Sequence, residues 1–260
     1  MNYSTIMVTQ NKDVATVALH RPEVHNAFNE KVIEELIKCF RSLSNDQSIR
    51  VIVLTGTGKS FCAGADLSWM KSMVHFSKEE NRRDSQQILQ LYESIYECPK
   101  PVIGRINGNA FGGGAGLVAV CDISIASSGA LFAFSEVKLG IIPAVISSFV
   151  AARLSPAVMQ RLFITGERFD AEYAVKIGLI DYVVDTHLLD EKVQLYVDVL
   201  RSSGPEAIKE VKNLIRSMRQ MGQSSYKMFT VEKITQLRVS PEGQEGITAF
   251  LEKRKSKWSE

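Results

Sequence analysis

A short glycine-rich segment is the first candidate for chemistry in this chain. Gly112, Gly113 and Gly114 follow one another in FGGGAGLVAVCD, and Gly116 lies inside the helix that we expect next. Each glycine within a helix costs about 1 kcal/mol relative to alanine. A first helical turn without side chains leaves backbone N–H groups open to a close ligand, and the helix dipole favours negative charge there. The segment therefore suits a phosphate, or a carbonyl oxygen that becomes an oxyanion.

A second segment of the same kind strengthens this interpretation. Glycines that only permit tight helix packing explain a lone Gly-Gly-Gly equally well, and the spacing is not the GxGxxG dinucleotide fingerprint. However, FCAGADLSWM at 61–70 also follows an apolar run, and Ala63, Gly64 and Ala65 give its backbone little cover before a helix start at Asp66. If both segments lie at one sheet edge, one N–H from each could hold a single carbonyl oxygen, as enolate stabilisation requires.

Strands and helices alternate through the first two thirds of the chain. The runs predicted as strands are 5–10 and 15–20, which form a hairpin, then 50–56, 101–106, 122–127, the start of 131–144, and 181–185. A helix capped by Asn29 is expected to bury Val32, Ile33, Leu36, Ile37, Phe40 and Leu43. A helix over 77–98 is expected to turn inward Ile88, Leu89, Tyr92, Ile95 and Tyr96. From Ala144 onward helical patterns dominate. We predict an α/β fold with a β/α core at 1–195 and a helical region at 196–260.

Composition bounds the function further. The chain has 260 residues, 45% of them hydrophobic, and a formal charge of +2 gives no global reason to expect nucleic acid or a membrane as partner. The four cysteines form no CxxC pair, the four histidines have no metal-ligand spacing, and no apolar run approaches the ~20 residues of a membrane span. The N-terminal residues lack the pattern of a signal peptide. These features predict a cytoplasmic globular protein without a metal.

Taken in order, the segments resemble the crotonase family, also called the enoyl-CoA hydratase and isomerase superfamily. The resemblance covers nearly the whole chain. It rests on HRPEVHNAF, FCAGADL, NGNAFGGGAGLVAVCD, FAFSEVKLGIIP, ITGERFDAEYAVKIGLIDYVV and AFLEKRKSKW. It implies a crotonase-type ββα superhelical core with a helical C-terminal trimerisation region, and a homotrimer or a hexamer built as a pair of trimers.

The resemblance also implies a site for an acyl-CoA thioester. The backbone N–H groups of Ala65 and Gly113 would form its oxyanion hole. The implied contacts to the adenine and pantetheine of coenzyme A are Val24, Ala27, Ala63, Asp66 and Leu67. Lys253 would approach the nucleotide phosphate, often from a neighbouring subunit, although a solvated helix end explains the lysine-rich segment 253–257 as well. Coenzyme A enters only as part of the substrate, so no separate cofactor is implied.

One departure from the family leaves the reaction open. Family hydratases hold water between two glutamates; the later one maps to Glu136, but the earlier position is Gly116. We favour hydration in which Glu136 alone activates water and returns its proton on the same face, with space at Gly116 for a bulkier or branched acyl group. The segments around both residues resemble the bacterial branch that acts on 3-methylglutaconyl-CoA or a related carboxylated terpenoid acyl-CoA. Isomerisation, decarboxylation, thioester hydrolysis and catalytically silent acyl-CoA binding remain alternatives.

Three further features of the sequence bear on the site. An extended backbone would turn Lys138 to the same face as Glu136, but an ordinary surface lysine is the commoner case, and we leave Lys138 outside the predicted site. Cys62 has no histidine partner in any motif, which argues against a nucleophile. Acyl-pocket or lid residues are expected between Asp66 and Arg83, although core packing explains them equally: Trp69, Met70, Met73, His75 and Phe76.

Overall fold

A six-stranded sheet organises the chain, which the computed structural model describes over residues 3–259. Its strand order is β1-β2-β3-β4-β6-β9, and only the first pair is antiparallel. Its strands are β1 (Ile6–Asn11), β2 (Val14–Leu19), β3 (Val51–Gly56), β4 (Val102–Ile106), β6 (Ile123–Ser127) and β9 (Tyr182–Val184). The predicted hairpin and the predicted buried strands are confirmed. All six residues of β3 are buried, as expected for a strand covered on both faces.

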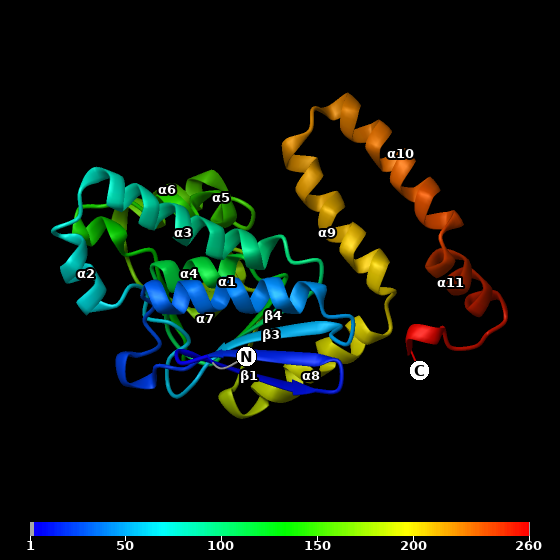
Figure 1. The fold of residues 1–260 in the computed structure, drawn as a ribbon, viewed down its shortest axis with the longest axis horizontal. Coiled ribbons are helices and arrows are strands. Elements are labelled where there is room, and N and C mark those ends of the chain that lie inside the picture. The colour runs from blue at the N-terminus through cyan, green and yellow to red at the C-terminus, as the bar shows by residue number, and fades with distance from the viewer. Residues whose placement is uncertain (1–2, 260) are drawn as a thin grey trace.

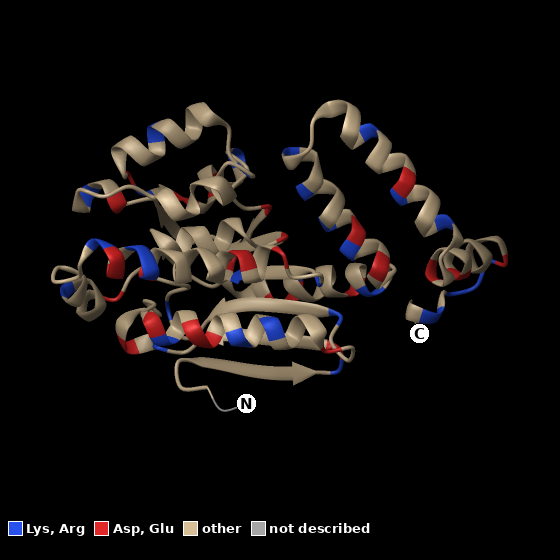
Figure 2. Ribbon diagram, turned by 45° about the horizontal axis from the view of Figure 1, so that its top comes forward, with Lys and Arg blue, Asp and Glu red and all other residues tan. Residues whose placement is uncertain are grey.

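The helices have the following bounds. They are α1 (Glu30–Asn45), α2 (Leu67–Met73), α3 (Lys78–Tyr96), α4 (Gly113–Ala119), α5 (Ala144–Val150), α6 (Pro156–Thr165), α7 (Ala171–Lys176), α8 (Leu189–Arg201), α9 (Pro205–Gln220), α10 (Gln223–Val239) and α11 (Pro241–Leu251). The described part of the chain also contains four 3-10 turns, which are η1 (Pro22–Val24), η2 (Glu136–Leu139), η3 (Thr186–Leu188) and η4 (Lys257–Ser259). Acidic and basic residues are interspersed along these elements (Figure 2), and their numbers nearly balance at a net charge of +2.

Helices lie on both faces of the main sheet (Figure 1), and an apolar cluster fills the space on each side. The larger core includes the buried faces of α1 and α3. Asn29 caps α1 by accepting a hydrogen bond from the Val32 N–H, and all six side chains expected to be buried in this helix are buried. On α3 one expectation is wrong, because Leu89 is exposed and Leu91 is buried in its place. The buried stripe passes through Leu91, Tyr92 and Ile95, at the three- and four-residue spacing of one helical face.

Helix α8 covers the other face of the sheet. Its side chains Leu189, Val193 and Val197 pack against Val51, Val53, Ile103 and Ile125. The predicted domain boundary between residues 195 and 196 therefore falls inside α8, whose apolar stripe belongs to the core. The chain leaves the core only at Gly204, the residue before α9.

A second, small sheet was not predicted. Its order is β5-β7-β8, formed by β5 (Ala110–Phe111), β7 (Leu131–Ala133) and β8 (Phe169–Asp170). Strands of two or three residues are too short to show an alternation of apolar and polar side chains, so β5 and β8 leave no pattern in the sequence. This sheet matters for the site, because it joins the glycine segment to the segment that contains Glu136.

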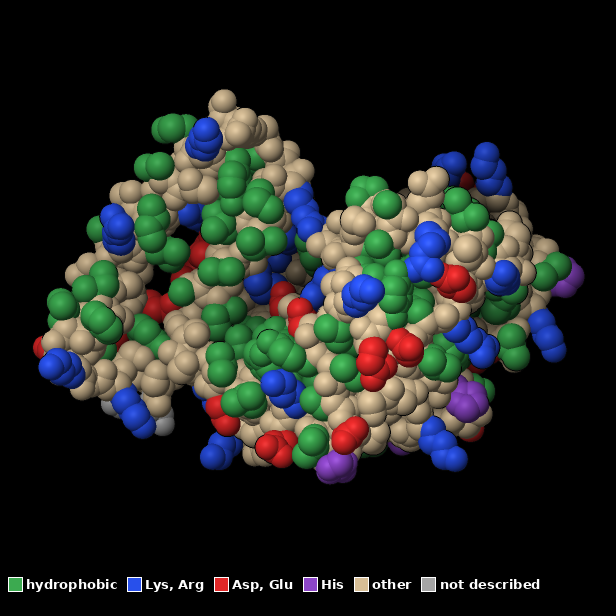
Figure 3. Space-filling model, turned by 180° about the vertical axis from the view of Figure 1, so that it is seen from behind, with side chains coloured by type: hydrophobic (Ala, Val, Ile, Leu, Met, Phe, Trp, Pro, Cys, Tyr) green, Lys and Arg blue, Asp and Glu red, His purple; other side chains and the backbone are tan. Residues whose placement is uncertain are grey.

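Helices α9, α10 and α11 form an arm that extends from the core (Figure 1). Lys212 anchors α9, since its ammonium lies 2.6 Å from a carboxylate oxygen of Asp122 and donates to the Lys100 carbonyl oxygen. Hydrophobic side chains gather over the arm (Figure 3). Among them Val211, Val231 and Phe250 are exposed. Within residues 3–259 no helix combines the length and the apolarity needed to cross a bilayer.

Candidate active site

Three loops meet where the parallel strands β2, β3 and β4 end. Phe28 and Ala65 form one parallel bridge, and Cys62 and Ala110 form another. The Phe28 N–H donates to the Gly64 carbonyl oxygen at 2.8 Å, and the Phe111 N–H donates to the Cys62 carbonyl oxygen at 3.0 Å. The two glycine segments of the sequence are therefore adjacent in space, through hydrogen bonds that hold the loops as short continuations of the sheet.

Gly64 sets how closely these loops approach. Its φ of +91° lies in a region that residues with a Cβ rarely adopt. A Cβ on Gly64 would lie 2.8 Å from the Phe111 carbonyl oxygen and 3.9 Å from the Gly113 nitrogen. In the described part of the chain, neither the Ala65 N–H nor the Gly113 N–H has a hydrogen-bond partner. Two unpaired donors from separate loops thus lie near each other, as an oxyanion hole requires.

The small sheet brings Glu136 to the same place. The Gly112 N–H donates to the Ala133 carbonyl oxygen at 2.8 Å, so β7 runs beside the glycine segment and Glu136 follows three residues later. Glu136 Oε1 lies 3.4 Å from the position that a Cβ on Gly112 would occupy. Glu136 Oε2 is buried and has no hydrogen-bond partner within residues 3–259. Burial raises the pKa of this carboxyl above its ordinary value.

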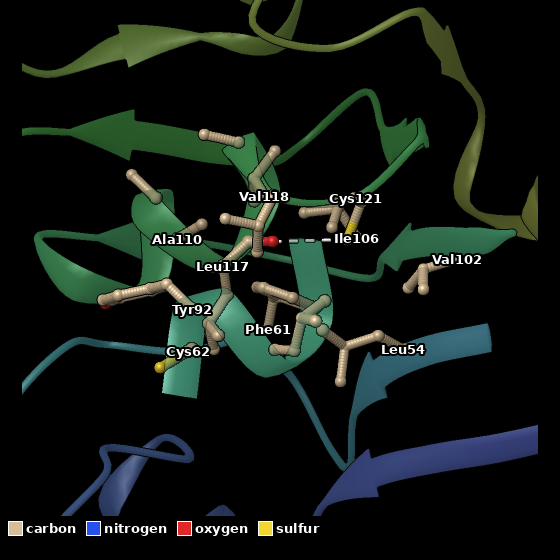
Figure 4. Close-up of a cluster of buried hydrophobic side chains, with 14 of the residues drawn as sticks. Leu54, Phe61, Cys62, Tyr92, Val102, Ile106, Ala110, Leu117, Val118 and Cys121 are labelled. Carbon is tan, nitrogen blue, oxygen red and sulfur yellow. Dashed lines mark hydrogen bonds between the residues drawn. The ribbon is translucent and has the colours of Figure 1, made fainter. Parts of the chain in front are cut away.

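Tyr92 and Phe28 fix the position of Gly113. The Tyr92 hydroxyl donates to the Gly113 carbonyl oxygen at 2.9 Å. A Cβ on Gly113 would lie 2.3 Å from Phe28 Cζ and 2.8 Å from the Tyr92 hydroxyl oxygen, so the position has no room for a side chain. Burial, followed by the charges of Cys62 and Glu136, holds the pKa of Tyr92 well above its ordinary value, which keeps the hydroxyl a donor. Figure 4 shows Tyr92 among buried side chains that include Cys62 and Ala110. The sequence predicts only that Tyr92 faces inward, and its hydrogen bond to Gly113 was not predicted.

The space expected at Gly116 is not open, and that expectation is wrong. A Cβ on Gly116 would lie 2.5 Å from Ile146 Cγ2 and 3.1 Å from two carbons of the Tyr92 ring. The volume beside the glycine is filled by α5 and α3, so Gly116 serves the packing of these helices on α4. Any role of Gly116 toward substrate remains a prediction.

Lys138 does not share a face with Glu136 in the way an extended backbone would allow. Residues 136–139 form the 3-10 turn η2, in which side chains two positions apart diverge. The Lys138 side chain packs over Gly166, with Cγ and Cε each 3.3 Å from the position of a Cβ there. Cys62 is fully buried, and burial raises the pKa of its thiol to about 12, so it is a neutral core residue at physiological pH.

The residues predicted to contact coenzyme A lie along the same loops, with one exception. Ala63 donates its N–H to the His25 carbonyl oxygen, and the Arg21 guanidinium donates to the Ala27 carbonyl oxygen and to Asp66 Oδ2, each at 2.7 Å. The buried Asp66 carboxylate also caps α2, whereas Leu67 is 75% exposed. Val24 ends η1 at the start of this cluster.

Lys253 is the exception. It follows α11 in the arm, on the opposite side of the molecule from α2 (Figure 1). A single chain therefore does not bring Lys253 to the other predicted residues.

Comparisons with known proteins show the family to which the chain belongs. The family model described as enoyl-CoA hydratase/isomerase matches residues 9–260. The chain is 32% identical to the short-chain-enoyl-CoA hydratase of Clostridium acetobutylicum, over 98% of this chain and 97% of that protein. It is 31% identical to the crotonyl-CoA hydratase of Syntrophomonas wolfei, over 98% of each. The crystal structure of an enoyl-CoA hydratase from Shewanella pealeana matches with a TM-score of 0.95 and 38% identity, covering 98% of this chain and 96% of that one.

The fold is thus of the crotonase type. The chain belongs to the enoyl-CoA hydratase/isomerase family, and it is an enzyme of the lyase class within it.

Replacing Gly64 with alanine tests the constraint on the loops. We expect Gly64→Ala to lower the free energy of unfolding by about 1–3 kcal/mol, because the new Cβ meets the Phe111 carbonyl oxygen and the backbone is strained. Urea denaturation measures the effect. Gly129→Ala is the matched control, since a Cβ there has no neighbour within 4 Å. Equal stability of the two variants would contradict the constraint.

Glu136 is expected to lower stability when it is ionised. Its pKa is raised in the folded state, so folding favours the protonated carboxyl, and this contribution is lost as the pH rises through the folded-state pKa. Glu136→Gln should therefore raise the melting temperature at pH 7, and the difference should shrink as the pH falls toward 4.5, the ordinary pKa. Thermal unfolding of both proteins over this range measures it; a pH-independent difference would refute the assignment.

Proposed function

We propose that this protein is an enoyl-CoA hydratase, which adds water to the double bond of a 2-enoyl-CoA thioester. The observation that carries the proposal is the buried Glu136 Oε2, which lacks a partner in the described chain and lies beside the Gly112–Gly113 backbone. A base next to two unpaired N–H groups is what addition of water to a conjugated thioester requires. The names of the relatives from Clostridium acetobutylicum and Syntrophomonas wolfei support the same reaction.

In the proposed mechanism, the thioester carbonyl oxygen accepts hydrogen bonds from the N–H groups of Ala65 and Gly113. Glu136 accepts a proton from water as the water oxygen bonds to C3, and the C2–C3 π electrons move to form the enolate. The two N–H groups stabilise the enolate oxygen; one such donor is worth about 10²–10³ in rate. Glu136 then gives the same proton to C2 on the same face, which yields the 3-hydroxyacyl-CoA and regenerates the carboxylate. Coenzyme A takes part only as a portion of the substrate.

The binding residues follow from the same loops. We assign the contacts to coenzyme A to Val24, Ala27, Ala63 and Leu67, with Asp66 holding α2 in place through Arg21. Lys253 would reach the nucleotide phosphate from a neighbouring copy of the chain. The proposed acyl group is 3-methylglutaconyl or a related carboxylated chain, on the strength of the sequence resemblance. The absence of a side chain at Gly116 does not support this choice of acyl group, because Ile146 occupies the space beside the glycine.

Replacing Glu136 tests the base. We expect Glu136→Gln to lower kcat for crotonyl-CoA by about 10²–10⁴-fold, the usual contribution of a general acid–base group, while binding of the thioester is kept. In the unchanged protein, kcat/KM should fall as the pH falls through the raised pKa of Glu136, because the base must be ionised. Stopped-flow and steady-state assays of hydration measure both effects.

The control for this test is Glu172→Gln, which changes an exposed carboxylate on α7. Unchanged turnover in Glu136→Gln would rule out Glu136 as the base. Product identification from the same assays separates water addition from a double-bond shift, decarboxylation or release of coenzyme A.

We also propose that the arm joins copies of this chain into a homotrimer or a hexamer in the cytoplasm. The exposed apolar residues of α10 and α11 support the assembly, and the four buried, unpaired cysteines are compatible with a reducing compartment. Light scattering should give three or six times the 28.9 kDa chain mass. Val231→Asp should lower the mass, whereas the control Lys12→Glu, at an exposed lysine in the turn between β1 and β2 and outside the arm, should not. A 28.9 kDa particle for the unchanged protein would overturn this proposal.

A further inference from the structure

Two buried side-chain polar atoms have no hydrogen-bond partner within residues 3–259. One is the acceptor Glu136 Oε2, and the other is a donor, Trp69 Nε1. Nearly all such groups in folded proteins are paired, and an unpaired one costs about 1–3 kcal/mol. The proposed mechanism uses the acceptor. It makes no use of the indole N–H of Trp69.

Trp69 lies next to the proposed oxyanion hole. It belongs to α2, which begins two residues after Ala65, and it is the one side chain of that helix that is buried, at 4% exposure. Its ring centroid lies 6.2 Å from that of Phe28. Phe28 in turn packs against Gly113, where a Cβ would lie 2.3 Å from Phe28 Cζ. The ring of Phe28 thus separates Trp69 from Gly113, so Trp69 lies near the proposed oxyanion hole without contacting the thioester position itself.

We propose that Trp69 determines specificity by donating its indole N–H to an oxygen atom at the distal end of the acyl chain. The inference rests on the proposed function and names its substrate class: 2-enoyl-CoA thioesters that carry a distal carboxylate or carbonyl group. An indole nitrogen is a donor only, so a hydrocarbon chain leaves it unpaired and an oxygen satisfies it. A site that hydrogen-bonds its substrate discriminates against the analogue that lacks the partner, because the buried group is then left without one.

Matched substrates and a donor-free ring test the proposal. Trp69→Phe keeps an aromatic side chain and removes the N–H. The substrates are glutaconyl-CoA, its terminal methyl ester, and hex-2-enoyl-CoA, which has no distal oxygen. A hydrogen bond to a charged acceptor is worth about 1.5–3 kcal/mol, so we expect kcat/KM for glutaconyl-CoA to fall about 10- to 150-fold. The value for hex-2-enoyl-CoA should stay the same, and the ester should show whether a neutral carbonyl suffices.

The other tryptophan of the chain supplies the control. Trp258 lies after the arm, where its indole N–H already donates to the Ser202 carbonyl oxygen. Trp258→Phe should not change the ratio of the kcat/KM values for the two substrates. It also leaves Trp69 as the sole tryptophan, whose emission should shift on binding of glutaryl-CoA and not of hexanoyl-CoA, which are saturated and do not react. This measurement keeps the native Trp69 and stands even if Trp69→Phe does not fold.

The outcomes are separable. Equal losses for all three substrates in Trp69→Phe, no loss for any, or equal emission changes with both saturated ligands would overturn the role of Trp69 and leave it a packing residue. Failure of the unchanged protein to hydrate any of the three substrates would instead overturn the proposed function. The emission arm would then still decide whether the indole meets a distal oxygen.

Discussion

The close approach of the loops after β3 and β4 is the constraint on which the rest of the site depends. Parallel strands end at one edge of a sheet, but side chains would normally keep the following loops apart. Here the left-handed backbone of Gly64 and the bare position at Gly113 let two main chains pack against each other, with Phe28 and Tyr92 closing the remaining space. The donors of the proposed oxyanion hole are main-chain groups, so their placement is set by the sheet and not by side-chain rotamers.

The same closeness explains the state of Glu136. A carboxyl packed beside the Gly112 backbone is shielded from water, and the shielding raises its pKa. Tyr92 is shielded further and keeps its proton, so it can hold the Gly113 peptide without competing as an acid. A dry environment thus gives two neighbouring groups different tasks: one binds and releases a proton, and the other fixes the backbone.

Much of this could be read from the sequence because it depends on local patterns. The cap at Asn29, the apolar stripe of α1 and the buried run of β3 each follow from spacing, and the resemblance placed Ala65, Gly113 and Glu136 on segments that the structure brings together. The rest depends on contacts between distant segments. Neither the two-residue strands of the small sheet nor the hydroxyl of Tyr92 at Gly113 leaves a periodic signal, and an absent side chain at Gly116 says nothing about which neighbour fills the gap.

The fit of Ile146 against Gly116 has an evolutionary consequence. A glutamate at position 116 would place its Cβ 2.5 Å from Ile146 Cγ2 and 3.1 Å from the Tyr92 ring, so these neighbours would have to move. A smaller residue at position 146 would relieve the closest of these contacts. Packing therefore makes the effect of a substitution at position 116 depend on the side chain at position 146, which is an epistatic constraint.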